Sequence, residues 1–96
     1  MSWVPDLHDT AALTLPPAVV TDLEQLAEHV HNVWGSKRLA DGWRYGPERS
    51  TAERTMPSLV PYADLPEDER DYDRELVTET VKMLLRLGYR VSRDPS

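Results

Sequence analysis

The proline- and glycine-rich stretch 42–66 constrains the fold of this chain more than any other feature. It holds two glycines and four prolines, and its apolar residues show no helical repeat. Proline fixes φ and lacks a backbone donor, so the stretch can neither continue a helix nor enter the middle of a sheet. A periodic apolar pattern lies on each side of it. The sequence therefore predicts a mainly α fold of two principal helices, with a long ordered loop and short β-strands.

The first helix is predicted at about 21–34, with an extension to about 40. Thr21-Asp22-Leu23-Glu24 has the form of a capping box. Gly35 either ends the helix or only weakens it, and Gly42 is the firmer stop. The helix is amphipathic, and its apolar stripe is formed by Leu23, Leu26, Ala27, Val30, Val33 and Trp34.

The second helix is the most strongly marked element. Asp64 and Pro66 are predicted to begin it as N-cap and first helical residue, and a separate short turn is allowed for at 66–70. From Tyr72 onward a wide apolar stripe indicates a well-buried helix. Its acidic opening and basic end match the helix dipole. Gly88 supplies the expected stop.

The remaining segments are predicted to be extended. Residues 1–20 contain three prolines and no sustained helical period, so we expect an arm that lies over the core. The short apolar pieces 58–60 and 89–91 can each form a strand. These boundaries divide the chain into the N-terminal arm, one domain over residues 21–91 and a tail over residues 92–96.

The charge of the chain argues against nucleic acid as a partner. Its formal net charge is −6, whereas nucleic-acid binding depends on Lys and Arg that neutralise phosphates. Residues 37–54 are the exception, because five basic residues there stand against three acidic ones, a net +2 that leaves −8 on the remainder. That segment can meet one small anionic ligand, but the rest of the surface would repel a DNA duplex.

The composition also bears on location. Cysteine is absent, so there is no disulfide framework and no cysteine-based metal site, in keeping with the cytoplasm. No apolar run is long enough for a transmembrane helix, and the N-terminus lacks the basic and apolar regions of a signal peptide. We therefore expect a cytoplasmic protein that does not bind membranes.

A set of short motifs runs without a gap from the first helix to Val91. Each piece is weak alone, but the combination is specific. The pieces are Leu26-Ala27-Glu28, His31, Trp34, Gly42-Trp43, Tyr45-Gly46-Pro47, Arg49, Pro57, Leu59-Val60, Leu65-Pro66-Glu67, Glu69-Arg70, Tyr72, Glu79-Thr80, Lys82, Leu84-Leu85 and Leu87-Gly88. Together they resemble the ryanodine receptor repeat, or RyR domain, in its single-copy prokaryotic or phage form.

The resemblance implies a small, mostly helical binding module. In the receptors two repeats pack with approximate two-fold symmetry, and the family looks like a binder of purines or nucleotides near the Gly-Trp segment, here Gly42-Trp43. A single-copy chain can rebuild that arrangement as a homodimer, the commonest oligomer symmetry. The implied ligand is a purine-containing or nucleotide-like molecule.

Three residues are the first candidates for the site. Trp43 follows a glycine that lets the indole face a cleft, and stacking on a base contributes about 1–3 kcal/mol; alternatively, Trp43 plugs the core under the loop. His31 and Tyr45 would orient the ligand. A histidine at the edge of an apolar stripe more often bonds a neighbouring backbone or carboxylate group. A buried tyrosine with a satisfied hydroxyl is at least as common as one that faces a pocket.

Four further residues complete the candidate set. Arg38 or Arg49 would meet a negative group on the ligand, although each has an acidic neighbour and can simply be solvated. Trp34 lies on the helical stripe, which favours the core over the site. Tyr62 either lines the pocket or is buried like other tyrosines.

No catalytic or metal site is predicted. The carboxylates of 67–75 are expected to form a solvated face, in which Arg70 and Arg74 make i,i+4 pairs and nothing more. His29 and His31 lie two apart on a helix, so they do not face each other as zinc ligands would. No nucleophile elbow, P-loop or dinucleotide motif occurs.

These observations favour a non-catalytic module that binds a purine- or nucleotide-like ligand and needs no cofactor. The alternative is a protein-interaction or dimerisation domain without a small-molecule ligand.

Overall fold

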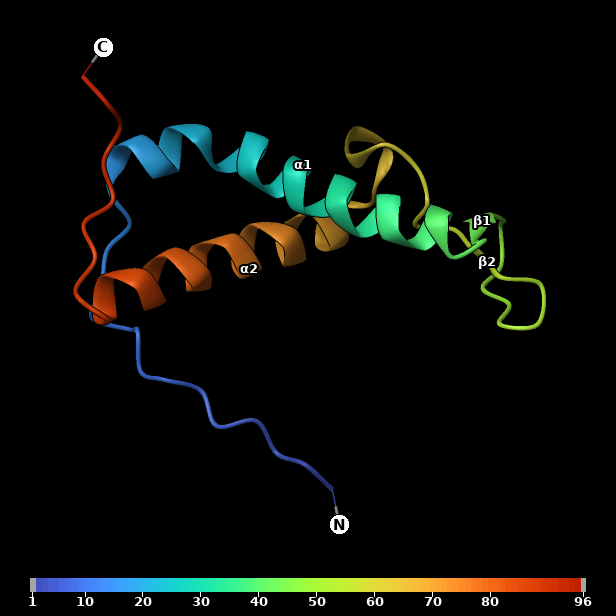
Figure 1. Cartoon of the computed structure of the whole chain (residues 1–96), viewed down its shortest axis with the longest axis horizontal. Helices are drawn as coiled ribbons and strands as arrows, with labels where there is room; N and C mark the ends of the chain where they lie inside the picture. The colour runs from blue at the N-terminus through green and yellow to red at the C-terminus, as the bar shows by residue number, and fades with distance from the viewer. Residues whose placement is uncertain (1, 96) are drawn as a thin grey trace.

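The computed structural model describes residues 2–95 and shows two antiparallel helices joined by a long loop (Figure 1). Helix α1 spans Pro17–Ala40 and helix α2 spans Glu67–Arg86. Between them lie strand β1, Arg44–Tyr45, strand β2, Thr55–Met56, and a short 3-10 helix, η1, Tyr62–Asp64. The predicted mainly α fold with a long loop is confirmed.

Helix α1 begins earlier than predicted. Pro17 lies in its first turn, where the missing donor of a proline costs nothing and its fixed φ suits the helix. Two N–H groups of that turn bond the carbonyl of Pro16. Thr21 lies further inside the helix, and its hydroxyl donates to the Pro17 carbonyl over 3.2 Å. The predicted capping box at Thr21 is therefore wrong, and the extended backbone ends at Pro16.

The predicted extension of α1 to about residue 40 is confirmed. The helix continues through Gly35 and ends at Ala40. Gly42, with a φ of +88°, then turns the chain, and the next N–H group, that of Trp43, bonds the Arg38 carbonyl over 3.0 Å. A left-handed glycine just after a helix is the usual way to satisfy its last carbonyls.

The part of α1 nearest Ala40 extends beyond α2 and leads into β1 and β2 (Figure 1). We call residues 42–56 the strand end. The two strands pair in parallel, with Arg44 opposite Thr55 and Tyr45 opposite Met56. The strands predicted at 58–60 and 89–91 are wrong: the first is a turn and bend, and the second has no regular structure. Prolines flank the first piece and deprive it of ladder donors.

Helix α2 is one continuous helix. Pro66 is its N-cap, and its carbonyl accepts bonds from two N–H groups of the first turn. Asp64 lies in η1 and does not cap α2. The predicted N-cap at Asp64 and the separate turn at 66–70 are therefore wrong. The predicted stop at Gly88 is confirmed, because its φ is +100°.

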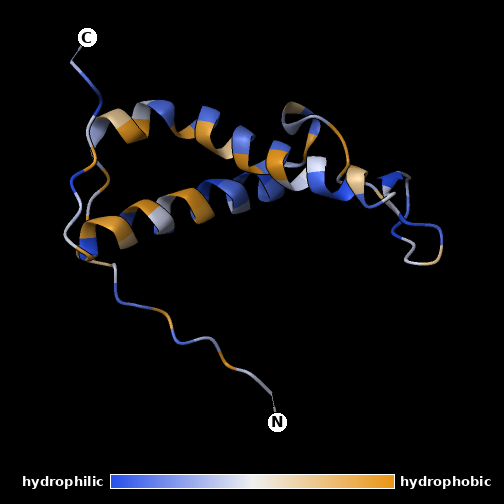
Figure 2. Cartoon of the chain, in the orientation of Figure 1, coloured by the Kyte–Doolittle hydropathy of each residue, from blue (hydrophilic) through white to orange (hydrophobic). Residues whose placement is uncertain are grey.

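The core between the helices is small. Ala27 of α1 is completely buried against Tyr62 and Leu65, and Val60 packs beside them. Among residues 2–95, no large side chain is completely buried. Figure 2 shows apolar residues along α1 and in the C-terminal half of α2. Since α1 covers only part of α2, several of these side chains stay exposed.

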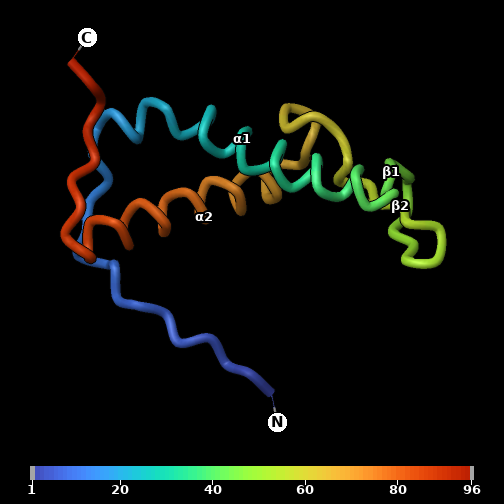
Figure 3. The backbone as a smooth tube through the Cα atoms, in the orientation of Figure 1, coloured from blue at the N-terminus to red at the C-terminus, as the bar shows by residue number. Residues whose placement is uncertain are grey.

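Both ends of the chain are tied to the helices. The Thr10 hydroxyl donates to Glu79 of α2 over 2.7 Å, and Arg93 pairs with Asp22 of α1. Before Thr10 the arm leads away from the helices (Figure 3), and Trp3 on it is 85% exposed. The arm is extended as predicted, but most of it does not lie over the core.

Candidate functional site

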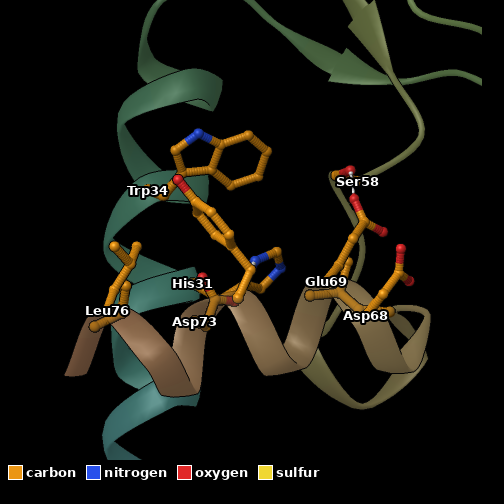
Figure 4. A pocket seen from close by; sticks show the side chains of 10 residues that line it. His31, Trp34, Ser58, Asp68, Glu69, Asp73 and Leu76 are labelled. Carbon is orange, nitrogen blue, oxygen red and sulfur yellow. Dashed lines mark hydrogen bonds and ion pairs between the residues drawn. The ribbon is translucent and has the colours of Figure 1, made fainter. Parts of the chain in front are cut away.

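A cavity of about 520 Å³ opens between the middle of α1, the N-terminal half of α2 and the loop that joins them (Figure 4). Its volume is typical of a small-molecule site. The α2 residues that line it recur at the spacing of one helix face. The lining consists of Val30, His31 and Trp34 from α1, Ser58 and Leu65 from the loop, and Asp68, Glu69, Tyr72, Asp73 and Leu76 from α2.

His31 is the buried polar residue at the centre of this cavity. Its Nε2 lies 2.7 Å from the carbonyl oxygen of Val60. A carbonyl can only accept, so Nε2 carries the proton and donates. In the neutral ring Nδ1 is then a bare acceptor, and it lies 4.0 Å from Oδ2 of Asp73. The cavity therefore receives an acceptor nitrogen and a carboxylate side by side.

Aromatic rings surround His31. Trp34 stacks on the imidazole with ring centroids 5.5 Å apart and an interplanar angle of 28°. Tyr62 lies on the core side at 6.3 Å with a tilted ring. Trp34 is half-buried and Tyr72 is exposed, and both line the cavity. Flat aromatic faces of this kind can stack against a planar ligand.

The α2 side of the cavity is acidic. Asp68, Glu69 and Asp73 line it, and the lining contains no lysine or arginine. Glu69 accepts a hydrogen bond of 2.6 Å from the Ser58 hydroxyl, which joins α2 to the loop (Figure 4). Burial raises the pKa of the Asp73 carboxyl, and the negative charge of Glu69 adds to the rise; His31 opposes it only in its protonated form.

The strand end carries a separate group of aromatic and basic residues. The Arg38 guanidinium lies over the indole of Trp43, 5.5 Å from the ring centroid, a favourable cation–π distance. Trp43 is half-buried, whereas Tyr45 and Arg49 are exposed. None of these four residues lines the cavity around His31.

The structure thus divides the seven predicted site residues into two groups. His31 and Trp34 line the cavity and Tyr62 lies just behind it in the core. Arg38, Trp43, Tyr45 and Arg49 belong to the strand end and its junction with α1.

Sequence reasoning missed the acidic wall of the cavity. Glu69, Asp73 and Leu76 are spaced to share one face of a helix, and that signal was available. The sequence predicts a solvated face for the carboxylates of this segment, because nothing local shows that α1 runs beside them.

Arg74 also differs from its prediction. It was expected to make only an i,i+4 pair, but it binds Glu24 on α1 in addition to Glu67 and Asp71 on its own helix. These contacts lower the pKa of Glu24 and of Glu67, mainly through hydrogen bonds from the Arg74 guanidinium. The prediction of a purely local pair is wrong, since Arg74 joins the two helices that enclose the cavity.

Within residues 2–95, neither helix is both long and apolar enough to cross a membrane. Over the same residues, no group of three or more His, Asp or Glu side chains is arranged to hold a metal ion.

A family comparison covers almost the whole chain. The family model described as the RyR domain matches residues 3–93. The match takes in the N-terminal arm, both helices and the loop that lines the cavity.

Proposed function

The chain belongs to the RyR domain family, and from its cavity we propose that it is a non-catalytic module that binds a flat, purine-type ligand between α1 and α2. The observation that carries this proposal is the stacked pair of His31 and Trp34 at the wall of a cavity of about 520 Å³. A few polar groups in an otherwise apolar and aromatic hollow are the usual composition of a ligand site.

A purine ring matches this wall in two ways. Its face can stack on the indole of Trp34, a contact that contributes about 1–3 kcal/mol for a base on an aromatic side chain. The N–H groups of its exocyclic amino group can donate to the carboxylates of Asp73 and Glu69. The cavity would then recognise the ligand by its N–H groups, because the carboxylates are hydrogen-bond acceptors.

The charge of the cavity favours a base or nucleoside over a nucleotide at this position. The carboxylates of Asp68, Glu69 and Asp73 would repel a phosphate. A nucleotide's negative groups are better met near the strand end, where Arg38 and Arg49 lie. Binding of a nucleotide would therefore involve the strand end of the same chain or of a second copy.

The proposal includes no chemical step and no cofactor. The sequence holds no nucleophile elbow, P-loop or dinucleotide motif. The proposed setting is the cytoplasm, in keeping with a chain that contains no cysteine.

Isothermal titration tests this function directly. Adenosine, adenine, AMP and ADP-ribose are titrated into the full chain and into the variants Trp34→Leu and Trp43→Leu, with circular dichroism as the check on folding. We expect adenosine to bind more tightly than AMP. Trp34→Leu is expected to weaken adenosine binding by about tenfold or more, the loss of one base–aromatic stack.

The matched variant Trp43→Leu separates the two groups of residues. It removes an indole outside the cavity and is expected to leave adenosine binding unchanged. If Trp43→Leu abolishes binding and Trp34→Leu does not, the site lies at the strand end. If none of the four compounds binds at millimolar concentration, the proposed function is wrong.

A second candidate function is dimerisation without a small ligand. The accessible surface is 7642 Å², whereas a folded monomer of 11.0 kDa exposes about 5,600 Å². The radius of gyration is 16.3 Å, against about 12.5 Å for a compact domain of this length. A second copy is proposed to cover part of the excess, which includes Trp3, Leu84 and Leu87.

Sedimentation velocity tests this alternative. A homodimer is expected for the full chain, and Leu84→Glu is expected to shift it toward monomer. A strict monomer at all concentrations would eliminate the dimer and leave the ligand-binding proposal to stand alone.

A further inference from the structure

We propose that the cavity selects an organic cation: a flat ring with a protonated amino or amidine edge, whose N–H groups bridge His31 Nδ1 and Asp73 Oδ2. This names the ligand class of the cavity and rests on the proposal above that the cavity is a ligand site. It differs from the proposed function in requiring positive charge on the ligand.

The first observation is the unpartnered nitrogen of His31. The side chain is only 8% exposed, and its Nε2 proton is already donated to Val60. Among residues 2–95, no donor lies within hydrogen-bond distance of Nδ1, while His31 lines the cavity. Nδ1 is not sealed from solvent, because it is absent from the buried polar atoms that lack a partner, so an N–H group of a ligand in the cavity can reach it and donate to it.

The second observation is the spacing of two acceptors. Nδ1 of His31 and Oδ2 of Asp73 are 4.0 Å apart, too far for a hydrogen bond between them. One nitrogen of an amino or amidine group can lie about 2.9 Å from both atoms at once. It then donates one hydrogen to each, and a positive charge on that nitrogen strengthens both bonds.

The third observation is that the charged side chains around His31 Nδ1 and Asp73 Oδ2 are negative. The ionisable carboxylates of the lining are those of Asp68, Glu69 and Asp73, and the lining contains no lysine or arginine to balance them; His31 adds no positive charge in its neutral form. Burial of Asp73 makes its ionised form costly, as the rise of its pKa shows. A bound cation would supply the missing charge. Because no three ligating side chains converge among the described residues, the arrangement suits an organic cation rather than a metal ion.

The aromatic residues fit the same class of ligand. Trp34 and Tyr72 line the cavity beside the carboxylates. An aromatic face attracts a cation through its quadrupole, most strongly for tryptophan. A charged ring therefore gains from the same stacking contacts that a neutral ring uses, with the electrostatic attraction added.

Two isomers provide a direct test. 1-Methyladenosine is a cation at pH 7, whereas N6-methyladenosine has the same atoms and is neutral. Each is titrated calorimetrically into the full chain, together with benzamidine and its neutral analogue benzamide. We expect 1-methyladenosine and benzamidine to bind about tenfold or more tightly than their neutral counterparts, the difference between charged and neutral hydrogen bonds.

Two variants test whether the preference for the charged compounds depends on the cavity. Asp73→Asn keeps the shape and removes the charge, and is expected to bring the two isomers to similar affinity. Glu28→Gln removes one charge from an exposed position on α1 and is expected to leave the preference intact. If Asp73→Asn does not fold, the comparison of the four compounds on the unaltered chain still decides the matter.

The outcomes separate this inference from the proposed function. Equal binding of the two isomers overturns the cation and leaves the purine site. Binding of benzamidine alone, lost in Asp73→Asn, supports the cation and overturns the purine. A preference for the cations that survives in Asp73→Asn overturns the assignment of the charge to His31 Nδ1 and Asp73 Oδ2, and no binding by any compound overturns both proposals.

Discussion

Arg74 on α2 binds Glu24 on α1 with two nitrogens of one guanidinium: Nε pairs with one carboxylate oxygen and Nη2 donates to the other over 3.2 Å. Glu24 also accepts a hydrogen bond of 3.3 Å from the hydroxyl of Tyr62, which lies in the core behind His31. This pair therefore connects both helices to the wall of the cavity.

Replacing Arg74 by lysine is expected to lower the stability of the chain slightly. Lysine keeps the charge but cannot present the planar fork that meets Glu24 with two bonds. Urea unfolding followed by circular dichroism measures the change, and Arg90→Lys at an exposed position is the control. Equal shifts in the urea midpoint for both variants would contradict a bridging role for Arg74.

Acid is expected to weaken the same connection. Hydrogen bonds from Arg74 lower the pKa of Glu24 and of Glu67 in the folded chain. A depressed folded pKa contributes stability above the ordinary glutamate pKa of 4.5, and that contribution is lost as pH falls through the lowered value. Urea midpoints are measured from pH 7 to pH 3. We expect a smaller acid loss in Arg74→Ala, and an unchanged loss would show that other carboxylates dominate.

The variant Asp73→Asn is expected to be more stable than the unaltered chain at pH 7. Burial raises the folded pKa of Asp73, so the ionised group costs stability as pH rises above the ordinary aspartate value of 3.8. Asparagine resembles the uncharged acid and removes that cost. The advantage should vanish below pH 3.8. A less stable variant at pH 7 would mean that His31 is protonated in the folded chain and that its attraction to Asp73 outweighs the burial.

Two substitutions of His31 separate its structural role from ligand binding. His31→Ala is expected to cost about 2–3 kcal/mol, because it leaves the Val60 carbonyl without its donor and opens a cavity. His31→Gln can place an amide N–H near the position of Nε2, so it should recover much of that stability. It lacks the Nδ1 acceptor, and we expect weak binding of 1-methyladenosine. Full binding by His31→Gln would exclude Nδ1 as a ligand contact.

Two glycine substitutions are expected to have opposite signs. At Gly35 a Cβ meets only Leu59 at 3.8 Å, so Gly35→Ala should stabilise the helix by about 0.5–1 kcal/mol. At Gly46 a Cβ would lie 2.6 Å from Cβ of Thr55, and Gly46→Ala should destabilise the strand end by about 1–3 kcal/mol. Thermal unfolding and amide exchange measure the two effects. If Gly46→Ala did not destabilise the chain, the two strands would have to move apart to accept the added Cβ.

Local signals in the sequence were enough to place most of the two helices. The apolar stripe of α1, the acidic opening of α2 and the stops at Gly42 and Gly88 all depend on residues within a few positions of each other. The start of α1 was misplaced because Thr21 imitates a capping box. Pro17 is an equally local signal for the first turn of a helix, and α1 begins there.

Contacts between distant segments could not be predicted in the same way. The parallel pairing of Tyr45 with Met56 depends on how the loop folds back, and neither strand has a pattern of its own. The bond between Glu24 and Arg74 joins residues far apart in sequence. The acidic wall of the cavity became visible only once α1 was placed beside α2, since a row of carboxylates on an isolated helix is indistinguishable from a solvated face.

Because α1 extends beyond α2, we expect the strand end and the region around Ala27 to differ in local stability. The strand end buries Thr55 and Met56 but has no second helix packed along it (Figure 1), so opening it should require less free energy than opening the region around Ala27. Its amides should exchange first with solvent deuterium. We therefore expect the strand end to open more often than the region that holds His31.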